Sequence, residues 1–299
     1  MLRSLLVCVD LSPSSDRVVA RAAALPLGKN AKITLLHVVP KLIPSNARKR
    51  AEADARRALE LHAKVLARAA TGGVVIRQVV KAGSAAGQIA TLARSSKAEL
   101  VVVGRGGGRV RDVFLGSTAE RVIRQGQLPV LVVRLAARGA YARPAMALAL
   151  DEAADEVIET MLKVIEPPRL EVTLIHAYRV PFEATVYPSL SSVDAEEWRT
   201  HEQRKARQEL AKLLNSTLER SGIAQHDAPI WKLQVRLGSP RTVIPRAVEQ
   251  ARADLLVLGT HGHAGLAHAF LGTVAGDLLR EVACDALVVP PRHETSEPS

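Results

Sequence analysis

The sequence is poor in cysteine and in aromatic residues. Its 299 residues include two cysteines, and Phe, Trp and Tyr together make up only 3%. Cys8 lies inside an apolar run and Cys284 stands just before another, so we expect two buried thiols rather than a disulfide or a metal pair. The scarcity of aromatic residues also disfavours a surface that stacks on nucleic-acid bases.

Long apolar runs are missing as well. None approaches the ~20 residues that a membrane-spanning helix needs. The N-terminal run ends at Asp10, which makes it too short for a signal peptide. With 47% apolar residues, the chain has enough material for two medium-sized hydrophobic cores. These features predict a globular cytoplasmic protein without a membrane partner.

The net charge of +11 is unevenly distributed. Residues 1–140 carry 24 Lys and Arg against 8 Asp and Glu, whereas residues 141–299 carry 17 against 22. A strongly basic half indicates either a solvated surface or a polyanion partner. The basic residues are scattered and few aromatic residues lie between them, so the solvated surface is the simpler interpretation.

The chain contains a long internal repeat. Its period is too long for a solenoid and indicates two duplicated domains, which we expect at residues 1–137 and 143–292, joined by a linker at 135–144. The second copy contains an insertion at 181–190, expected to be an ordered loop. The matching segments are 5–10 with 147–151, 33–39 with 172–178, 79–84 with 235–239, 98–104 with 253–259, and 128–133 with 285–290.

Each copy alternates short apolar runs with stretches of helical pattern. Near-continuous apolar runs are typical of strands that are covered on both faces, and βαβ alternation predicts a parallel sheet with helices on both sides. We therefore expect an α/β fold with five strands in each copy. Ser12 followed by Pro13 predicts one helix start, and Ser117 with Glu120 predicts a capping box at another.

A glycine motif occurs once in each copy. The second reads Gly259-x2-Gly262-x9-Gly272-Thr273, and the first has the same form with one residue fewer before Gly116. Glycines let backbone amides approach an anion, and a helix N-terminus adds free N–H donors. Since ligands bind at the carboxyl ends of strands in such sheets, the motif predicts a phosphate site. The alternative for each residue is a simple turn or helix cap.

Taken together, these motifs resemble the universal stress protein family in its tandem form. The resemblance rests on D-x-S at 10–12, L-H-V-V at 36–39, G-S at 83–84 and 238–239, A-D-L-L-V-L-G at 253–259, and the glycine motif. It covers about residues 2–134 and 143–290. It implies doubly wound domains with strand order 3-2-1-4-5, paired within the chain through their last strands. It also implies a role in stress tolerance and, in many members, ATP binding.

The resemblance also implies which residues hold the nucleotide. An aspartate after strand one contacts the nucleoside, a strand-two backbone position meets the adenine, and the glycine loop with the following helix start cradles the phosphates. The second copy is the slightly better candidate because its loop has full length. The matching residues are Asp10, Val38, Gly104, Gly107, Gly116, Ser117 and Thr118 in the first copy, and Asp151, Ala177, Gly259, Gly262, Gly272, Thr273 and Val274 in the second.

We therefore expect a nucleotide-responsive stress protein rather than an enzyme, with ATP as ligand, optionally with Mg²⁺. It would act on an unidentified protein partner or through homodimerisation. The rival hypothesis is a nucleotide-free module that docks an acidic protein or nucleic acid through the basic half. A third is a metal-dependent phosphoryl hydrolase. The loop histidines His261, His263 and His268 are discounted as a metal site, and the charged helix beginning near Trp198 is interpreted as solvated.

Overall fold

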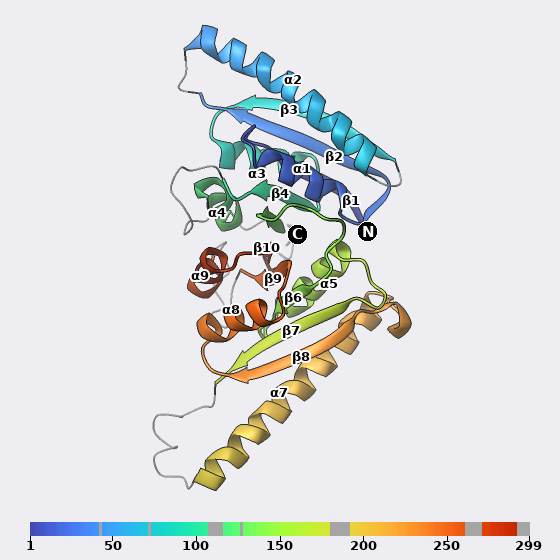
Figure 1. Ribbon diagram of the computed structural model, residues 1–299, viewed down its shortest axis with the longest axis vertical. Coiled ribbons are helices and arrows are strands. Elements are labelled where there is room, and N and C mark those ends of the chain that lie inside the picture. The colour runs from blue at the N-terminus through green and yellow to red at the C-terminus, as the bar shows by residue number, and fades with distance from the viewer. Residues whose placement is uncertain are drawn as a thin grey trace, which may run out of the picture.

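The computed structural model describes residues 1–41, 44–70, 73–106, 116–125, 128–179, 192–260 and 271–291. They form one ten-stranded sheet with helices on both faces (Figure 1). The first lobe contains β1 (Leu2–Cys8), α1 (Ser15–Ala23), β2 (Leu27–Val39), α2 (Ser45–Ala69), β3 (Val74–Ala82), α3 (Ala85–Ser95), β4 (Leu100–Gly104), α4 (Ser117–Arg124) and β5 (Val130–Val133). The α/β fold predicted from the alternating pattern is confirmed.

The second lobe repeats this succession. It contains β6 (Pro144–Ala147), α5 (Ala154–Val164), β7 (Glu171–Tyr178), α7 (Ser192–Arg220), a short 3-10 helix (Gln225–Asp227), β8 (Ile230–Leu237), α8 (Pro240–Gln250), β9 (Leu255–Gly259), α9 (Thr273–Glu281) and β10 (Asp285–Val289). The predicted insertion at 181–190 lies outside the described residues. Within the described ranges, none of the helices combines the length and apolar character needed to cross a bilayer.

The strand order is β3-β2-β1-β4-β5-β10-β9-β6-β7-β8. Strands within each lobe are parallel, and β10 pairs with β5 in the antiparallel direction, with Leu287 opposite Leu131. The two five-stranded sheets are therefore joined through their last strands, as the family resemblance implies. This pairing also gives each of those two edges a partner, which removes two exposed rows of backbone groups.

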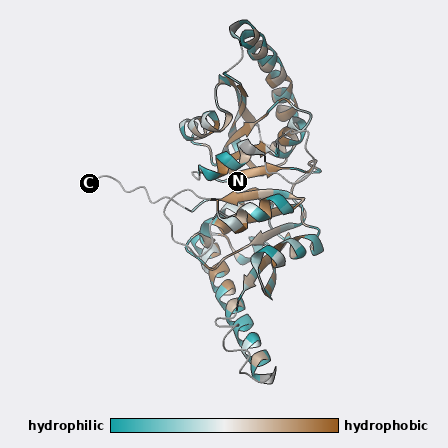
Figure 2. Ribbon diagram, turned by 90° about the vertical axis from the view of Figure 1, so that its left-hand side faces the viewer, coloured by the Kyte–Doolittle hydropathy of each residue, from teal (hydrophilic) through white to brown (hydrophobic). Residues whose placement is uncertain are grey.

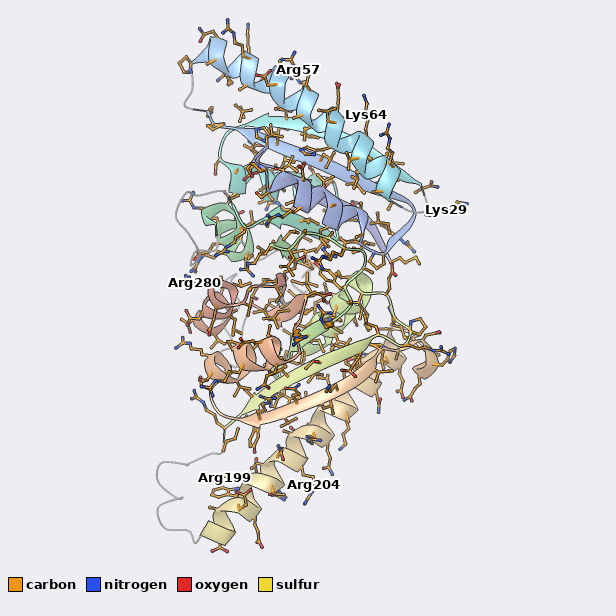
Figure 3. The ribbon with its side chains drawn as sticks, viewed as in Figure 1. Lys29, Arg57, Lys64, Arg199, Arg204 and Arg280 are labelled. Carbon is orange, nitrogen blue, oxygen red and sulfur yellow. The ribbon has the colours of Figure 1, made fainter. Side chains whose placement is uncertain are left out.

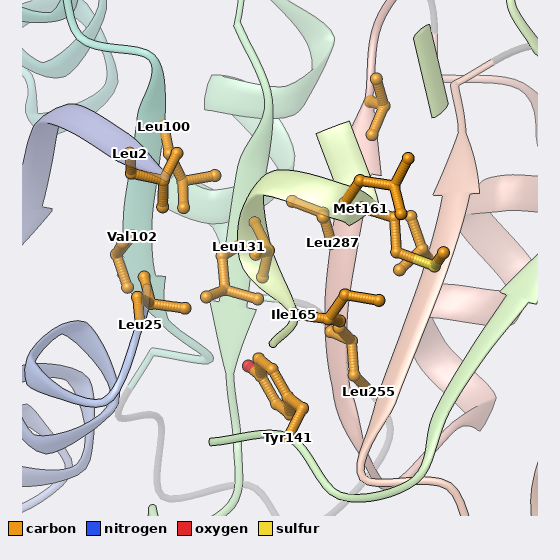
Figure 4. Close-up of a cluster of buried hydrophobic side chains, with 14 of the residues drawn as sticks. Leu2, Leu25, Leu100, Val102, Leu131, Tyr141, Met161, Ile165, Leu255 and Leu287 are labelled. Carbon is orange, nitrogen blue, oxygen red and sulfur yellow. The ribbon is translucent and has the colours of Figure 1, made fainter. Parts of the chain in front are cut away.

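Two hydrophobic cores lie on opposite faces of the sheet, and both extend across the lobe boundary. Helices α1, α2, α5 and α7 cover one face, and α3, α4, α8 and α9 cover the other. Leu131 and Leu287 are fully buried at the junction, between core residues of both lobes (Figure 4). Each such leucine stabilises the fold by about 1.5–3 kcal/mol. Figure 2 shows the strands largely in hydrophobic colours and hydrophilic colour along the helices.

A buried carboxylate ties the two lobes together at this junction. The Asp285 side chain has no exposed surface. Its Oδ1 accepts hydrogen bonds from the backbone amides of Arg134 at 2.7 Å and Leu135 at 2.8 Å. Its Oδ2 accepts from Arg21 Nε at 3.1 Å and from the Tyr141 hydroxyl at 2.8 Å. The carboxylate of the second lobe is thus held by the first lobe and by the linker.

The two arginines around Asp285 are themselves held in place. Arg21 donates to the Gly139 carbonyl oxygen at 2.9 Å and stacks on the Tyr141 ring, 3.9 Å from its centroid. Arg134 donates to the carbonyl oxygens of Cys284, at 2.9 Å, and of Leu279. Burial, together with the nearby Asp285 charge, raises the pKa of Tyr141 well above its ordinary value. The linker is therefore an integral part of the junction.

The two thiols are expected to resist modification in the folded protein. Cys284 is buried as predicted, whereas Cys8 is only partly buried, and neither forms a disulfide. Desolvation raises the pKa of both thiols, that of Cys284 to about 12. Because the thiolate is the reactive form, we expect negligible reaction with a thiol-exchange reagent near pH 8 and reaction of both thiols after unfolding in urea. Rapid labelling of the native protein would contradict this prediction.

Candidate functional site

The carboxyl end of the first strand in the second lobe carries Asp151. The residue follows β6 by four positions, and its Oδ1 accepts a hydrogen bond from the Ala153 amide at 3.1 Å. This turn leads directly into α5. Asp151 lies at the wall of a large cavity, where a carboxylate is suited to accept hydrogen bonds from the hydroxyl groups of a sugar.

Asp10 occupies the matching place in the first lobe but has a different environment. Its Oδ1 accepts hydrogen bonds from the Ser12 hydroxyl at 2.6 Å, the Ser12 amide at 3.0 Å and the Ser15 hydroxyl at 2.9 Å. Burial alone would raise its pKa, but these hydrogen bonds outweigh it and the pKa lies below its ordinary value. Asp10 thus organises the turn before α1. This helix begins at Ser15, after the predicted start at Ser12 and Pro13.

A histidine in the second strand of each lobe fixes the geometry beside these aspartates. His37 Nδ1 lies 2.9 Å from the Val9 carbonyl oxygen, and His176 Nδ1 lies 2.8 Å from the Leu148 carbonyl oxygen. Each bond joins residues 28 positions apart, so the repeat extends to this contact. The bonds hold the next residues, Val38 and Ala177, at the carboxyl edge of the sheet.

The two glycine loops close with the same hydrogen bonds. The Gly116 amide donates to the Arg105 carbonyl oxygen at 2.9 Å, and the Gly272 amide donates to the Thr260 carbonyl oxygen at 2.8 Å. The one-residue difference in loop length lies between these closing positions. Gly107 and Gly262 are outside the described residues, as are the three loop histidines. The shorter loop therefore starts and ends with the same bonds as the longer one.

Each loop leads into the N-terminus of a helix. Gly116 and Gly272 are the residues that precede α4 and α9. The predicted capping box is wrong, because Ser117 is already helical, which places Glu120 one position too far along to reach the cap. The first-turn amides have no partner within their own helix, so each N-terminus attracts anions. These turns contain Ser117 and Thr118 in α4, and Thr273 and Val274 in α9.

A cavity of about 1120 Å³ brings the second-lobe candidates together. Apolar side chains including Leu150 and Ile175 form part of its wall, and the first turn of α9 forms another part. An apolar wall beside a helix N-terminus suits a ligand with a flat ring at one end and phosphate at the other. The predicted residues that line it are Asp151, Ala177, Gly259, Gly272, Thr273 and Val274.

The first-lobe candidates lie apart from this cavity, around the ends of β1, β2 and β4 and the start of α4. At Gly116 a side chain has no room, because a Cβ would lie 2.2 Å from the Arg105 carbonyl oxygen. At Gly104 a Cβ would lie 3.3 Å from Val18. Close packing at the base of the loop thus requires glycine at position 116, whereas at position 104 the Val18 side chain would have to shift by a few tenths of an ångström. The described first-lobe positions are Asp10, Val38, Gly104, Gly116, Ser117 and Thr118.

Several cavity residues escaped the sequence analysis. The long helix α7, interpreted as solvated, contributes Glu202, Lys205 and Glu209 to the wall, together with Ala206. The dense charge of this helix predicted that it would be solvated, but one side of it is buried in the core through Leu210 and Leu214. The repeat comparison also gave no reason to place Arg124, a first-lobe residue, in the wall of the second-lobe cavity.

Comparison with known proteins agrees with the repeated fold. The sequence model of the universal stress protein family matches residues 1–134 and 145–290. A universal stress protein of Mycolicibacterium smegmatis is 28% identical over 300 residues, covering 96% of this chain and 97% of the relative. Universal stress protein Sll1388 of Synechocystis is 26% identical and covers 50% of this chain and 97% of its own length.

Solved structures show the same fold at lower sequence identity. A universal stress protein from Archaeoglobus fulgidus is similar with a TM-score of 0.66 and 16% identity, over 96% of each chain. A functionally unknown protein from Pseudomonas aeruginosa is similar with a TM-score of 0.61 and 17% identity, over 97% of this chain and 93% of its own. Both similarities extend over the two lobes together.

Proposed function

This chain belongs to the universal stress protein family, and we propose that its second lobe binds ATP or a related adenine nucleotide. One observation carries the proposal: a single cavity collects the turn aspartate, the strand-two position and the loop-and-helix start of the second lobe. A volume of about 1120 Å³ accommodates a ligand of this size.

The chemical fit follows from the residues that line the cavity. The first turn of α9 offers backbone amides and the Thr273 hydroxyl to phosphate oxygens. Asp151 accepts hydrogen bonds from ribose hydroxyls, and the backbone near Ala177 lies where the adenine edge would bind. Mg²⁺ would accompany the triphosphate as part of the ligand. Because these groups bind and orient rather than attack, we propose binding without dedicated catalysis.

In this proposal the nucleotide controls interactions with a partner. Occupancy would bias the arrangement of the glycine loop and α9, and hence the surface presented to a partner protein or to a second copy of the chain. The first test is to denature the purified protein, identify any released small molecule by mass spectrometry and determine its stoichiometry. Empty protein that also shows no calorimetric signal with ATP would rule the proposal out.

Matched substitutions of the two aspartates should assign the site. Asp151→Ala is expected to weaken ATP binding by about 10-fold or more, the effect of losing hydrogen bonds to a charged group. Asp10→Ala is expected to leave the same affinity within about twofold, because Asp10 belongs to the turn before α1. Isothermal titration calorimetry on both variants is the measurement. The reverse order of effects would place the site in the first lobe.

A docking module that acts through the basic first lobe is the competing proposal. Exposed cations such as Lys29, Arg57 and Lys64 mark this lobe (Figure 3). Part of that charge is already balanced on α2, where Arg57 pairs with Asp54 and Arg56 lies 3.9 Å from Glu52. If docking of a polyanion were the function, binding would fall steeply with salt and would not respond to Asp151→Ala.

A further inference from the structure

The helices that follow the two glycine loops correspond residue by residue. Gly116 corresponds to Gly272, since each closes its loop with the same hydrogen bond and each precedes its helix. Counting along α4 and α9 from these residues, Arg124 corresponds to Arg280. In the same register, Glu120 corresponds to Gly276. The arginine is thus repeated, whereas the carboxylate one turn before it is present only in the first lobe.

Each of these arginines approaches the helix of the other lobe. Arg280 Nη2 of the second lobe, whose side chain is labelled in Figure 3, lies 3.8 Å from Glu120 Oε1 of the first lobe. Arg124 of the first lobe lines the second-lobe cavity, as does Gly276. The antiparallel pairing of β5 with β10 relates the two lobes by a near-twofold axis, so each arginine approaches the helix of the other lobe. The last turn of each helix therefore lies close to the first part of the other.

The equivalent positions Glu120 on α4 and Gly276 on α9 give the two arginines different surroundings. On the first-lobe helix, Glu120 accepts hydrogen bonds from Arg124 Nε at 3.0 Å and Nη2 at 2.8 Å. Gly276 has no side chain, and Arg280 Nη1 lies 3.9 Å from where its Cβ would be. Asp277 balances Arg280 at 3.2 Å and Arg241 at 2.8 Å. Arg124 is thus paired with Glu120 and Arg280 with Asp277, while the cavity wall as a whole carries four positive and four negative side chains.

We propose that Arg124, together with Arg280, binds the terminal phosphates of the nucleotide in the second lobe. This inference rests on the proposed nucleotide binding and adds its specificity: an arginine from the first lobe selects a di- or triphosphate over a monophosphate. Guanidinium groups suit this role because their N–H groups pair with phosphate oxygens in a fork. Glu120 orients Arg124 toward the cavity, and Gly276 leaves space along α9 for the phosphate chain.

Calorimetric titration with ATP and with AMP tests this assignment. Arg124→Ala is expected to weaken ATP binding by about tenfold and AMP binding by less than about twofold, since only the longer phosphate chain extends along α9. Gly276→Glu, which copies the first-lobe residue, is expected to weaken ATP binding selectively in the same way. Arg121→Ala is the matched control, because Arg121 lies exposed on the same helix and away from the cavity wall.

The possible outcomes separate this inference from the function on which it rests. If the unaltered protein binds neither nucleotide, both proposals fail. If it binds ATP but Arg124→Ala keeps the ATP-to-AMP affinity ratio of the unaltered protein, the arginine assignment alone fails. Selective loss of ATP affinity in Arg124→Ala, with Arg121→Ala unchanged and both variants showing native circular dichroism, supports the assignment.

Discussion

Replacing Asp285 with asparagine is expected to lower the free energy of unfolding by about 3–5 kcal/mol, the usual cost of removing one partner from a buried ion pair. The amide keeps the size of the side chain but removes its charge. Arg21 would remain almost fully buried, with a side-chain exposure of 4%, opposite a neutral group. The amide's N–H₂ end would also face donors, because both carboxylate oxygens accept two hydrogen bonds each.

Urea denaturation followed by circular dichroism measures this effect. Asp277→Asn provides the matched control, since Asp277 also pairs with two arginines but its side chain is 42% exposed. Surface pairs of this kind contribute about 0–1 kcal/mol. A similar loss of stability in the two variants would show that the buried junction carries no special weight. Tyr141→Phe, which removes one hydrogen bond to Asp285, should cost about 1–2 kcal/mol.

Gly116→Ala is the second substitution with a large expected effect, a loss of about 2–4 kcal/mol from steric overlap and a broken hydrogen bond. The new methyl carbon would lie 2.2 Å from the Arg105 carbonyl oxygen, well inside van der Waals contact. Relief requires the loop ends to separate, which breaks the bond from the Gly116 amide to the same oxygen. The first-lobe loop would lose its closed base, while the ATP binding that we propose for the second lobe should stay unchanged.

Gly87→Ala, in α3, is the matched control and should act in the opposite direction. At this position the nearest atom to a new Cβ is Ser84 Cβ, at 3.8 Å, an ordinary contact. Alanine in place of a helical glycine stabilises by about 0.5–1 kcal/mol. Thermal denaturation of both variants compares the two signs directly. Equal behaviour of the two alanine variants would contradict the assigned role of Gly116.

The alternation of apolar runs and helical patterns was sufficient to predict the fold. Short, near-continuous apolar runs are typical of parallel strands that are covered by helices on both faces. The matching of 128–133 with 285–290, together with the family resemblance, also located the junction between β5 and β10. The strand ends were similarly predictable, since Asp10 and Asp151 each follow an apolar run. What failed locally were two helix starts: α1 begins at Ser15, after the predicted Ser12 and Pro13, and α4 has Gly116, one residue before the predicted Ser117, as its cap.

The contacts that sequence could not supply are those between distant segments. Asp285 meets Arg21 and Tyr141 at separations of 264 and 144 residues, and no spacing rule joins such positions. Arg124 belongs to the first lobe, although the cavity that it lines belongs to the second lobe. The face of α7 that lines the cavity carries charged residues, so composition alone predicted that this face would be exposed to solvent. Each case depends on how the two lobes pack, which the repeat does not encode.

The Asp285 contact also determines which lobes are compatible partners. The register of β5 on β4 and of β10 on β9 places Pro129 where the second lobe has Asp285. Two second lobes paired through this edge would bury two carboxylates without Arg21, and two first lobes would bury two arginines without Asp285, each at a high cost. The junction therefore favours unlike halves over like ones. A junction that needs Asp285 on one side and Arg21 on the other allows the two halves to differ in sequence elsewhere without becoming interchangeable.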